Sequence, residues 1–371
     1  MTNHFYMKIL IIEPYFTGSH KQWAESYKRN SSHDIKILSL KGQFWKWRMH
    51  GGAITLAKMF NEMDWLPDLI FTTDMLDLNT FLSLTRNKSN SIPTVIYFHE
   101  NQLSYPWSPS DRDIKNKRDS HYGFINYSSA LAADKVLFNS EFHMKSFLNA
   151  LNPFLKQFPD YQELETINII KEKSEVLFLG MDLTPFLKHI LIKDSRPNIL
   201  WNHRWEYDKN PQSFFSVLKR VKNEGNDFGL VILGEHFSKT PKVFEESKKE
   251  FVNQIVHWGY VDSFEEYAKW LWKSHIIPVT SNQEFFGVSV MEAMYCGVYP
   301  ILPNRLTYPE LIPEIFHKNN IYKTEEELFK KILWSINNCN DLAKCNIASI
   351  PKRFDWRLMS KEYDEKLEAT L

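Results

Sequence analysis

The sequence has 371 residues, which is long for one compact core and sufficient for two domains. Hydrophobic residues make up 43% and charged residues 24%, a composition typical of a soluble globular protein. The 45 basic and 45 acidic residues cancel, so the total charge indicates no broad nucleic-acid surface, although it is compatible with a local patch. The three cysteines, Cys296, Cys339 and Cys345, show no metal-ligand spacing and favour a reducing, cytoplasmic location.

The first half of the chain predicts short parallel strands. An Ile-rich run predicts a strand at residues 8–12, followed by a turn at 14–19 and a helix from His20. Because Glu13 and Pro14 interrupt this run at once, we expect no signal peptide and no stable membrane association. Further apolar runs predict strands at 35–40, 69–72, 94–98 and 135–139.

A second series of strands is predicted after residue 196. The apolar runs lie at 198–201, 229–233, 254–257, 275–278 and 298–302, with helix-like segments between them. The tail at 356–371 reads as a charged amphipathic helix. This alternation predicts an α/β protein with two doubly wound parallel sheets, whose ligands bind at the carboxyl ends of the strands.

Cationic side chains follow the predicted strand at 198–201. Arg204 and Lys209 lie five residues apart in NHRWEYDKN, and both side chains only donate hydrogen bonds. A diphosphate leaving group needs such cations, because negative charge grows on it as its bond to carbon breaks. A solvated surface loop explains the same residues equally well.

Two glutamates flank an apolar turn in EFFGVSVMEAMYCG, just after a predicted strand. Gly287 allows close backbone approach, and a helix from Val288 would aim free amides at an anion such as phosphate. Glu284 before this helix and Glu292 in its early turns accept hydrogen bonds when ionised, which suits sugar hydroxyls. The alternative is a pair of exposed glutamates on a packing helix.

Polar residues follow two strands of the first half. They are Gly18, Ser19 and His20 after the first strand, and His99, Glu100, Asn101 and Gln102 after the fourth. Such clusters at strand ends are candidate sites. His99 can act as an acid, a base or a hydrogen-bond partner near neutral pH, and the alternative is a structural histidine bonded to a carbonyl.

Basic and aromatic residues alternate in KGQFWKWR. This segment holds Trp45, Lys46, Trp47 and Arg48. Such a mixture can stack on nucleobases and neutralise phosphates, or it can be a helix that packs two tryptophans. Neither Gly-x-Gly-x-x-Gly nor a Gly-Lys-Ser/Thr loop follows a predicted strand, which disfavours a nicotinamide enzyme and a P-loop NTPase.

The two glutamates in EFFGVSVMEAM, with Arg204 and Lys209 after a strand, resemble the retaining GT-B glycosyltransferases of the glycogen-synthase-like superfamily. The resemblance covers nearly the whole chain. The commoner loop is Glu-Gly-Phe-Gly-Leu, so Phe285 stands in place of its first glycine. The resemblance implies two Rossmann-like domains that face a cleft. They would be an acceptor-side domain at 1–190 and a donor domain at 191–355, with a helix at 356–371 that crosses back onto the first domain.

A closer resemblance is carried by IIEPYFTGSHKQW, FWKWR, YFHENQLSYP, FNSEFH and WNHRWEYDKNP. Together these segments are similar to the tRNA-queuosine α-mannosyltransferase family, and HENQ and WNHRWEYDKNP are unusual among GT-B enzymes. The family implies GDP-mannose as the nucleotide-sugar donor and no separate cofactor. It implies the queuosine nucleoside of a tRNA as the acceptor.

The resemblance also assigns roles to matching residues. Arg204 and Lys209 would hold the donor diphosphate, Glu284 the sugar hydroxyls and Glu292 the ribose. Other donor contacts would come from Gly18, Ser19, His20 and the amides around Phe286, Gly287 and Val288. The acceptor would meet His99, Glu100, Asn101, Gln102, Trp45, Lys46, Trp47 and Arg48, and we add Lys115, Lys117 and Arg118 as hypothetical tRNA contacts. The expected catalytic residues are His99, Glu284, Arg204 and Lys209.

The implied reaction is hexose transfer with retention at the anomeric carbon, in which the leaving diphosphate helps to deprotonate the acceptor and no metal is required. The sequence shows no obvious nucleophile and acid pair of the kind that retaining hydrolases use. Two other functions stay open. One is a GT-B enzyme that modifies a lipid or a small metabolite with a GDP- or UDP-sugar. The other is a non-catalytic tRNA-binding protein, which would tolerate loss of Glu284 and Arg204.

Overall fold

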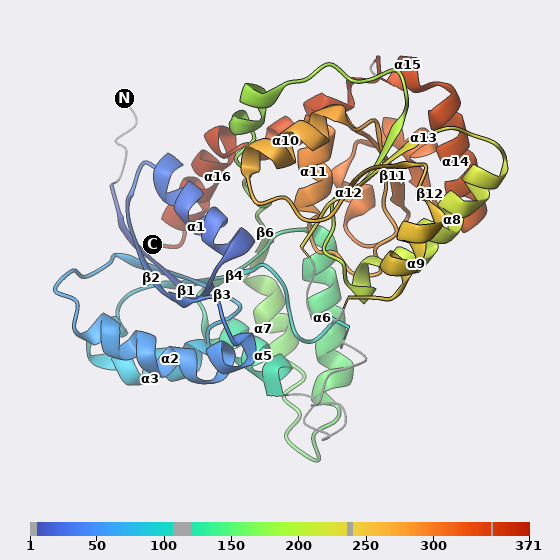
Figure 1. Cartoon of the computed structure of the whole chain (residues 1–371). Helices are drawn as coiled ribbons and strands as arrows, with labels where there is room; N and C mark the ends of the chain where they lie inside the picture. The colour runs from blue at the N-terminus through green and yellow to red at the C-terminus, as the bar shows by residue number, and fades with distance from the viewer. Residues whose placement is uncertain (1–5, 107–120, 236–239, 343) are drawn as a thin grey trace. The chain divides into compact units, whose positions relative to one another are not determined.

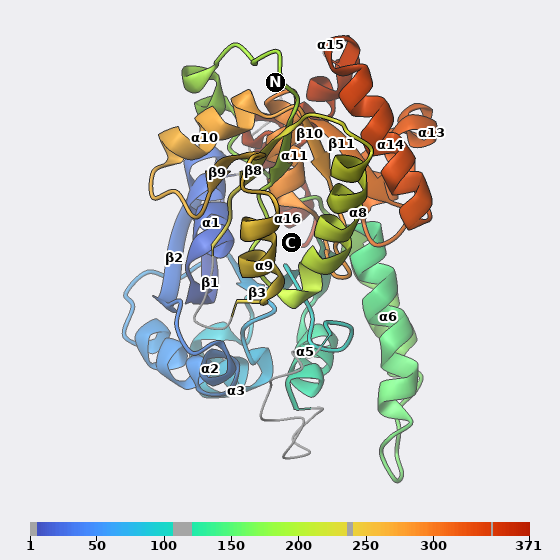
Figure 2. The same ribbon diagram turned by 45° about the vertical axis from the view of Figure 1, so that its right-hand side comes forward.

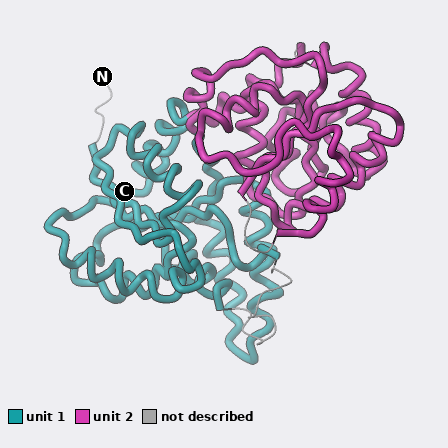
Figure 3. The backbone as a smooth tube through the Cα atoms, in the orientation of Figure 1, with its two compact units in different colours: residues 1–181, 356–371 teal, residues 182–355 magenta. Residues whose placement is uncertain are grey.

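A computed structural model of the chain describes residues 6–106, 121–235, 240–342 and 344–371. The chain forms two compact units, residues 1–181 with 356–371 and residues 182–355 (Figure 3). Each unit contains a six-stranded sheet in which every paired neighbour is parallel. The predicted α/β class with two doubly wound sheets is confirmed.

The sheet of the first unit has the strand order β2-β1-β3-β4-β5-β6. Its strands are β1 (Lys8–Phe16), β2 (Asp34–Lys41), β3 (Leu69–Thr73), β4 (Thr94–Phe98), β5 (Lys135–Phe138) and β6 (Ser174–Val176). Its helices are α1 (Gly18–Asn30), α2 (Trp45–Asn61), α3 (Leu78–Ser89), α5 (His121–Ala132), α6 (Glu141–Leu155), α7 (Thr166–Glu172) and α16 (Trp356–Glu368).

The turn predicted at 14–19 is wrong in its first half, because β1 continues through Pro14 to Phe16. The ladder between β1 and β3 ends at the pair of Ile12 and Thr72, so the missing amide hydrogen of Pro14 breaks no bond on that side. On the other side, the register with β2 shifts between Glu13 and Phe16. This irregularity accommodates the proline.

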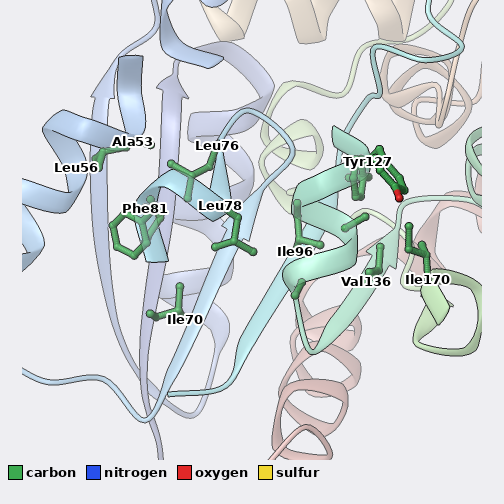
Figure 4. Close-up of a cluster of buried hydrophobic side chains, with 14 of the residues drawn as sticks. Ala53, Leu56, Ile70, Leu76, Leu78, Phe81, Ile96, Tyr127, Val136 and Ile170 are labelled. Carbon is green, nitrogen blue, oxygen red and sulfur yellow. The ribbon is translucent and has the colours of Figure 1, made fainter. Parts of the chain in front are cut away.

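The apolar side chains of the strands alternate between two faces of the first sheet. Ile70, Ile96 and Val136 point from β3, β4 and β5 into one core, which also contains Leu56 of α2 and Phe81 of α3 (Figure 4). Helices α2 and α3 lie side by side in both views (Figure 1 and Figure 2). Because both faces are covered, the strands are apolar runs without alternation in the sequence.

Helices α1 and α16 cover the opposite face of the first sheet (Figure 1). Trp23 of α1 stacks on Tyr97 of β4, with ring centroids 5.3 Å apart, and the Trp23 indole nitrogen donates to the Tyr363 hydroxyl of α16 at 3.2 Å. The chain thus returns from the second unit to complete the core of the first.

A buried carboxylate fastens α16 to α1. Asp364 Oδ1 accepts hydrogen bonds from the hydroxyls of Tyr27, at 2.7 Å, and Ser31, at 2.6 Å. Asp364 Oδ2 accepts from the backbone nitrogen and the hydroxyl of Ser32, both at 2.9 Å. Four donors on one carboxylate offset the cost of its burial.

The sheet of the second unit has the order β12-β11-β10-β7-β8-β9. Its strands are β7 (Asn198–Trp201), β8 (Gly229–Ile232), β9 (Ile255–Trp258), β10 (Ile276–Pro278), β11 (Tyr299–Pro303) and β12 (Ile321–Tyr322). Its α-helices are α8 (Pro211–Asn223), α9 (Val243–Glu250), α10 (Phe264–Lys273), α11 (Val288–Tyr295), α12 (Tyr308–Leu311), α13 (His317–Asn320), α14 (Glu325–Asn337) and α15 (Cys339–Leu342). Its 3-10 helices are η1 (Thr184–His189), η2 (Tyr207–Lys209), η3 (Glu314–Phe316) and η4 (Asn346–Phe354).

The strand order of the second sheet reverses between β7 and β10. The chain runs outward from β7 to β9 on one side and from β10 to β12 on the other. From β7 and β10 the chain therefore proceeds toward opposite edges of the sheet, and such a switch point in a doubly wound sheet is where ligands bind. In the described part of the chain, no helix has both the length and the apolar character of a membrane span.

We predict that Asp364→Ala lowers the free energy of unfolding of the first unit by about 3 kcal/mol, because four donors lose their charged acceptor. Urea denaturation measured by tryptophan fluorescence checks this. Glu365→Ala on the same helix, an exposed carboxylate 3.8 Å from Lys361, is the control and should change the value by less than about 0.5 kcal/mol. Equal effects of both variants would contradict the role of Asp364.

Candidate active site

Two loops meet at the point where the strand order of the second sheet reverses. One follows β7 and contains Asp208 and Lys209, and the other follows β10. The Thr280 hydroxyl donates to the Lys209 carbonyl oxygen at 3.0 Å, and the Asn282 amide donates to the Asp208 carbonyl oxygen at 2.7 Å. These two hydrogen bonds fix the loops to each other.

The Lys209 ammonium group is the main link between these loops. Its Nζ donates to the Gln283 carbonyl oxygen at 2.8 Å and lies 3.3 Å from Glu284 Oε2 and 3.2 Å from Asp208 Oδ2. The side chain is only 9% exposed, so solvent screens these charges weakly. The structure therefore brings the predicted residues Lys209 and Glu284 into a direct ion pair.

Glu284 is held in its ionised form. Burial alone would raise its pKa, but the charge of Lys209 and the amide of Phe286 outweigh burial and hold the pKa of this carboxyl below its usual value. Its Oε1 accepts from the amides of Phe285 at 3.1 Å and Phe286 at 3.4 Å. The carboxylate is thus available as a hydrogen-bond acceptor.

Arg204 lies beside the same pair of loops. Its Nη2 is 4.0 Å from Asp208 Oδ2, and its side chain is 46% exposed. The two predicted cations, Arg204 and Lys209, therefore both lie close to the buried carboxylate of Asp208. Sequence reasoning did not identify Asp208, because an acidic residue between two cations looks like an ordinary surface charge.

Gly287 makes the turn that starts α11. Its φ of 93° lies in the left-handed region, and an added Cβ would lie 3.4 Å from the Tyr308 ring. The helix begins at Val288 as predicted, and its amino end can accept an anion. Phe285 and Phe286 are buried, and Phe286 packs edge-on against Phe354 at 5.0 Å.

Glu292 lies on α11 and accepts a hydrogen bond of 2.7 Å from the Tyr267 hydroxyl. Burial raises the pKa of Glu292 to about 7, although the Tyr267 bond opposes the shift. The Asn202 side-chain amide donates to the Tyr267 hydroxyl at 3.2 Å and to the Ser289 carbonyl oxygen at 2.8 Å. Asn202 and Tyr267 thus orient Glu292, and the sequence analysis assigned no role to either residue.

His203 is a buried residue of the segment NHRWEYDKN, and the sequence analysis assigned no role to it. Its Nδ1 lies 3.0 Å from Ser289 Oγ, and burial together with the positive charge of Lys209 lowers its pKa to about 4. The ring is therefore neutral at physiological pH. Among the described residues its Nε2 has no hydrogen-bond partner. Its place directly after β7 was the signal that could have identified it.

The strand ends of the first unit carry a buried ion pair. His20 Nδ1 lies 2.9 Å from Glu13 Oε2, and Glu13 Oε1 accepts from the Tyr15 amide at 2.8 Å. Burial opposes the charge on His20, but the carboxylate of Glu13 outweighs it and raises the pKa of His20 to about 9. His20 is therefore protonated at neutral pH.

His99 has the opposite charge state. Its ring centroid lies 4.5 Å from that of His20 and 4.7 Å from that of Trp23. Burial and the positive charge of His20 hold the pKa of His99 well below its usual value. The structure thus brings two predicted histidines together, one charged and one neutral, which allows separate roles.

Side chains from three other elements hold the loop that contains His99. Asp74 Oδ1 accepts from the His99 amide at 2.8 Å, and Asn139 Nδ2 donates to the His99 carbonyl oxygen at 2.9 Å. Asn126 Oδ1 accepts from the Gln102 amide at 2.8 Å. These three positioning residues lie far from the loop in sequence, so no local motif indicates them.

The other predicted residues of the first unit lie in different surroundings. Asn101 is fully buried, and its Oδ1 accepts from the amides of Leu103 and Ser104, so its side chain forms the turn itself. Gln102 Nε2 donates to Glu100 Oε1 at 3.1 Å. The exposed Gly18 and Ser19 begin α1. Their predicted contacts with donor or acceptor stay predictions.

Trp45, Lys46, Trp47 and Arg48 form the first turn of α2. Trp45 packs against Tyr122 of α5, with centroids 5.2 Å apart, whereas Trp47 is 64% exposed. The further tRNA contacts predicted at Lys115, Lys117 and Arg118 lie outside the described residues.

Glu13, His20 and His99 could also hold a metal ion by distance, since one ligand atom of each lies within 4.8 Å of the others. A metal needs a neutral imidazole as its ligand. The raised pKa of His20 leaves this ring protonated and paired with Glu13, so the cluster fits an ion pair better than a metal site.

Comparison with known proteins gives matches over both units. Residues 8–181 match the family described as tRNA-queuosine alpha-mannosyltransferase N-terminal, and residues 185–349 match glycosyl transferases group 1. The tRNA-queuosine alpha-mannosyltransferase of Drosophila melanogaster is 36% identical over 334 residues, which cover 87% of this chain and 85% of that protein.

Solved structures match over nearly the whole chain. Anabaena HepE in complex with UDP has a TM-score of 0.64 at 16% identity, and the match covers 98% of this chain and all of that one. Sucrose-phosphate synthase from Thermosynechococcus elongatus has a TM-score of 0.70 at 12% identity, with 98% of each chain covered. These likenesses show the fold, and the predicted GT-B class is confirmed.

We predict that Glu13→Gln lowers the pKa of His20 from about 9, because burial is then opposed only by the smaller effects of the Asp74 and Glu100 charges. Histidine NMR titration checks this. In the wild type, a raised pKa stabilises the fold fully below pH 6.5, and this stability, about 3 kcal/mol, is lost as the pH rises through about 9.

Unfolding measured at pH 6 and pH 9.5 should show that loss of stability in the wild type and a clearly smaller loss in Glu13→Gln. Glu25→Gln, at an exposed pair with Lys21, is the control and should keep the wild-type pH dependence. An unchanged His20 titration in Glu13→Gln would refute the ion pair.

Proposed function

The chain belongs to the tRNA-queuosine alpha-mannosyltransferase family, and from this we propose that it transfers mannose from GDP-mannose to the queuosine nucleoside of a tRNA. It is a glycosyltransferase. The observation that carries the mechanism is the buried pair of Lys209 and Glu284 at the carboxyl ends of β7 and β10. It combines a cation for phosphate with an acceptor for hydroxyls in one place.

The donor diphosphate binds next to Lys209 and Arg204 in this proposal. Lys209 supplies a buried charge, and Arg204 supplies a half-exposed guanidinium that can pair with two phosphate oxygens. The amino end of α11, starting at Val288 after Gly287, adds backbone amides. These groups stabilise the charge that grows on the diphosphate as the bond to the sugar breaks.

The two glutamates bind the hydroxyls of the donor. Glu284 is ionised and preorganised by the Phe285 and Phe286 amides, so it accepts hydrogen bonds from the hexose. Glu292 is held by Tyr267 and accepts from the ribose. Phe285, which stands where the commoner loop has glycine, is buried.

In the first unit, His99 and His20 serve the reacting end of the sugar. The neutral imidazole of His99 can accept a hydrogen bond from a hydroxyl near the anomeric carbon, and the charged His20 favours negative groups nearby. The proposed surroundings of acceptor and donor are Glu100, Asn101 and Gln102, together with Gly18 and Ser19 at the start of α1.

The proposed step retains configuration at the anomeric carbon. The bond between this carbon and the diphosphate oxygen breaks, and the acceptor hydroxyl oxygen forms its bond on the same face. The proton of that hydroxyl passes to the leaving diphosphate, which departs as GDP. The protein supplies positioning and electrostatic stabilisation, and the scheme requires no separate cofactor.

We place this reaction in the cytoplasm, in agreement with the free thiols of Cys296, Cys339 and Cys345. Its macromolecular partner is then a tRNA that already carries queuosine.

We expect Arg204→Ala to lower the rate of hexose transfer about 100-fold, because a cation is lost from the leaving group. Lys209→Ala should lower the rate at least as much. It also removes the nearest cation from the carboxylates of Asp208 and Glu284, so the thermal stability should fall. Single-turnover kinetics on tRNA measure the rate.

Arg220→Ala is the matched control, because this exposed cation pairs with Glu326 on the surface of the second unit. It should keep the wild-type rate. Wild-type transfer by folded Arg204→Ala, with unchanged circular dichroism, would reject the assignment of the cation to the diphosphate.

The donor and acceptor can be tested together. The protein is mixed with GDP-mannose, GDP-glucose, UDP-glucose or UDP-galactose and with tRNA that contains or lacks queuosine, and the nucleosides are analysed by mass spectrometry. We expect a hexose mass shift only for queuosine with GDP-mannose. A hexose shift with a UDP-sugar would mean that the donor is that UDP-sugar and not GDP-mannose. Parallel reactions replace the tRNA with a lipid extract or with small metabolites, and transfer in these reactions alone would support the rival acceptors. Binding of tRNA without transfer from any donor would support a binding protein.

A further inference from the structure

The segment after Asp34 that forms the rest of β2 and all of α2 carries charged side chains of one sign only. Between Asp34 and Glu62 the sequence contains no acidic residue. It contains five cations, at Lys36, Lys41, Lys46, Arg48 and Lys58. Because the whole chain has no net charge, this segment is a local basic region. It suits a partner that carries phosphates.

The two tryptophans at the start of α2 differ in their surroundings. Trp45 packs against Tyr122 and is partly buried, so it belongs to the core between α2 and α5. Trp47 is 64% exposed. Only the second indole is available to stack on a ligand.

Gly51 provides the support for the Trp47 ring. A Cβ placed on Gly51 would lie 2.8 Å from Trp47 Cζ2 and 2.9 Å from Cε2, much closer than real contacts allow. The six-membered ring therefore lies against the bare backbone of Gly51, one helical turn further on. Contact with the helix restricts the ring before any ligand arrives, so stacking on it costs little further entropy.

Phe44 presents a second aromatic ring at the same helix start. It is 75% exposed, and its φ of 56° and ψ of 56° place a bulky residue in the left-handed region. Arg48 holds this turn: its amide donates to the Phe44 carbonyl oxygen at 3.0 Å, and its Nε donates to the Lys41 carbonyl oxygen at 3.0 Å. Phe44 therefore combines an unfavourable backbone conformation with an exposed apolar ring, and such strain is often found at functional sites.

We propose that Trp47 and Phe44 stack on unpaired bases of the tRNA, while Lys41 and Lys46 meet the neighbouring phosphates. The proposal deepens the proposed function and rests on it for the identity of the RNA. Aromatic rings stack on exposed bases, and lysines neutralise the backbone, in proteins that bind single-stranded nucleic acid. Trp45 and Arg48 have the supporting role of holding the helix start.

The exposed side chain of Ile54 distinguishes binding of RNA from docking of a protein partner. Ile54 is 58% exposed and lies two helical turns after Trp47, on the same face of α2. A protein that docked on an apolar helix face would use both residues. A base that stacks on an indole needs only the ring, and the surrounding positive charge favours this occupant.

The test compares the affinity of the full chain for two fluorescent probes, an unmodified tRNA transcript and a blunt RNA duplex with the same number of phosphates. We expect Trp47→Ala to weaken tRNA binding about 10-fold and duplex binding much less, and Trp47→Phe to retain most of the affinity. Gly51→Ala should weaken tRNA binding while the fold is preserved, because alanine is the stronger helix former. Lys46→Ala should reduce the slope of the logarithm of the tRNA binding constant against the logarithm of the salt concentration by about one, because one fewer counterion is released.

Ile54→Ala is the matched control and should bind tRNA as the wild type does. Wild-type affinity in both Trp47→Ala and Gly51→Ala overturns the proposal, as does a wild type that binds no tRNA. An equal loss in Ile54→Ala overturns it in favour of apolar docking. Hexose transfer by the wild type is measured in parallel. If tRNA binding depends on Trp47 but no hexose is transferred, only the proposed function is rejected. If hexose is transferred but tRNA binding does not depend on Trp47, only this inference is rejected.

Discussion

One buried ammonium group holds the loops of the second unit together. Lys209 meets the Gln283 carbonyl oxygen and the carboxylates of Asp208 and Glu284, so it joins the loop after β7 to the loop after β10. Since little solvent reaches it, its charge also acts on its neighbours: it keeps Glu284 ionised and favours a neutral His203. The geometry and the protonation of this region therefore depend on the same charge.

The first unit contains a similar arrangement of a carboxylate, a cation and a neutral imidazole, formed by different residues. There the cation is the protonated His20 beside Glu13, and the neighbouring neutral ring is His99. In both units a buried carboxylate and a cation form a close pair at strand ends, and the field of the cation opposes a second charge on the nearest imidazole. Neutral hydrogen-bonding rings are thereby kept beside fixed charges, so each pair of groups can offer both a hydrogen-bond acceptor and a positive charge to a polar ligand.

The sequence predicted most strands, because buried parallel strands are continuous apolar runs. It missed β6 and β12, which have three and two residues and are defined by their pairing alone. The motif residues Lys209 and Glu284 were found from their place after strands, but their mutual contact spans 75 positions of the chain. The sequence analysis also did not identify Asp74, Asn126 and Asn139, because their contacts with the loop at His99 join distant positions of the chain. Which of Trp45 and Trp47 faces solvent depends on the rotation of α2 against α5, and a residue pattern without contacts does not determine it.

The return of α16 to the first unit has a consequence for biosynthesis. Domains usually fold in order as the chain leaves the ribosome. Here the rings of Trp23 and Tyr27 stay without the cover of Tyr363 and Asp364 until the whole second unit has been translated. Until then, the face of the first unit that α16 later covers stays exposed to solvent. During this interval a chaperone can bind this apolar face. The second unit, in contrast, is continuous in sequence and can complete its fold first.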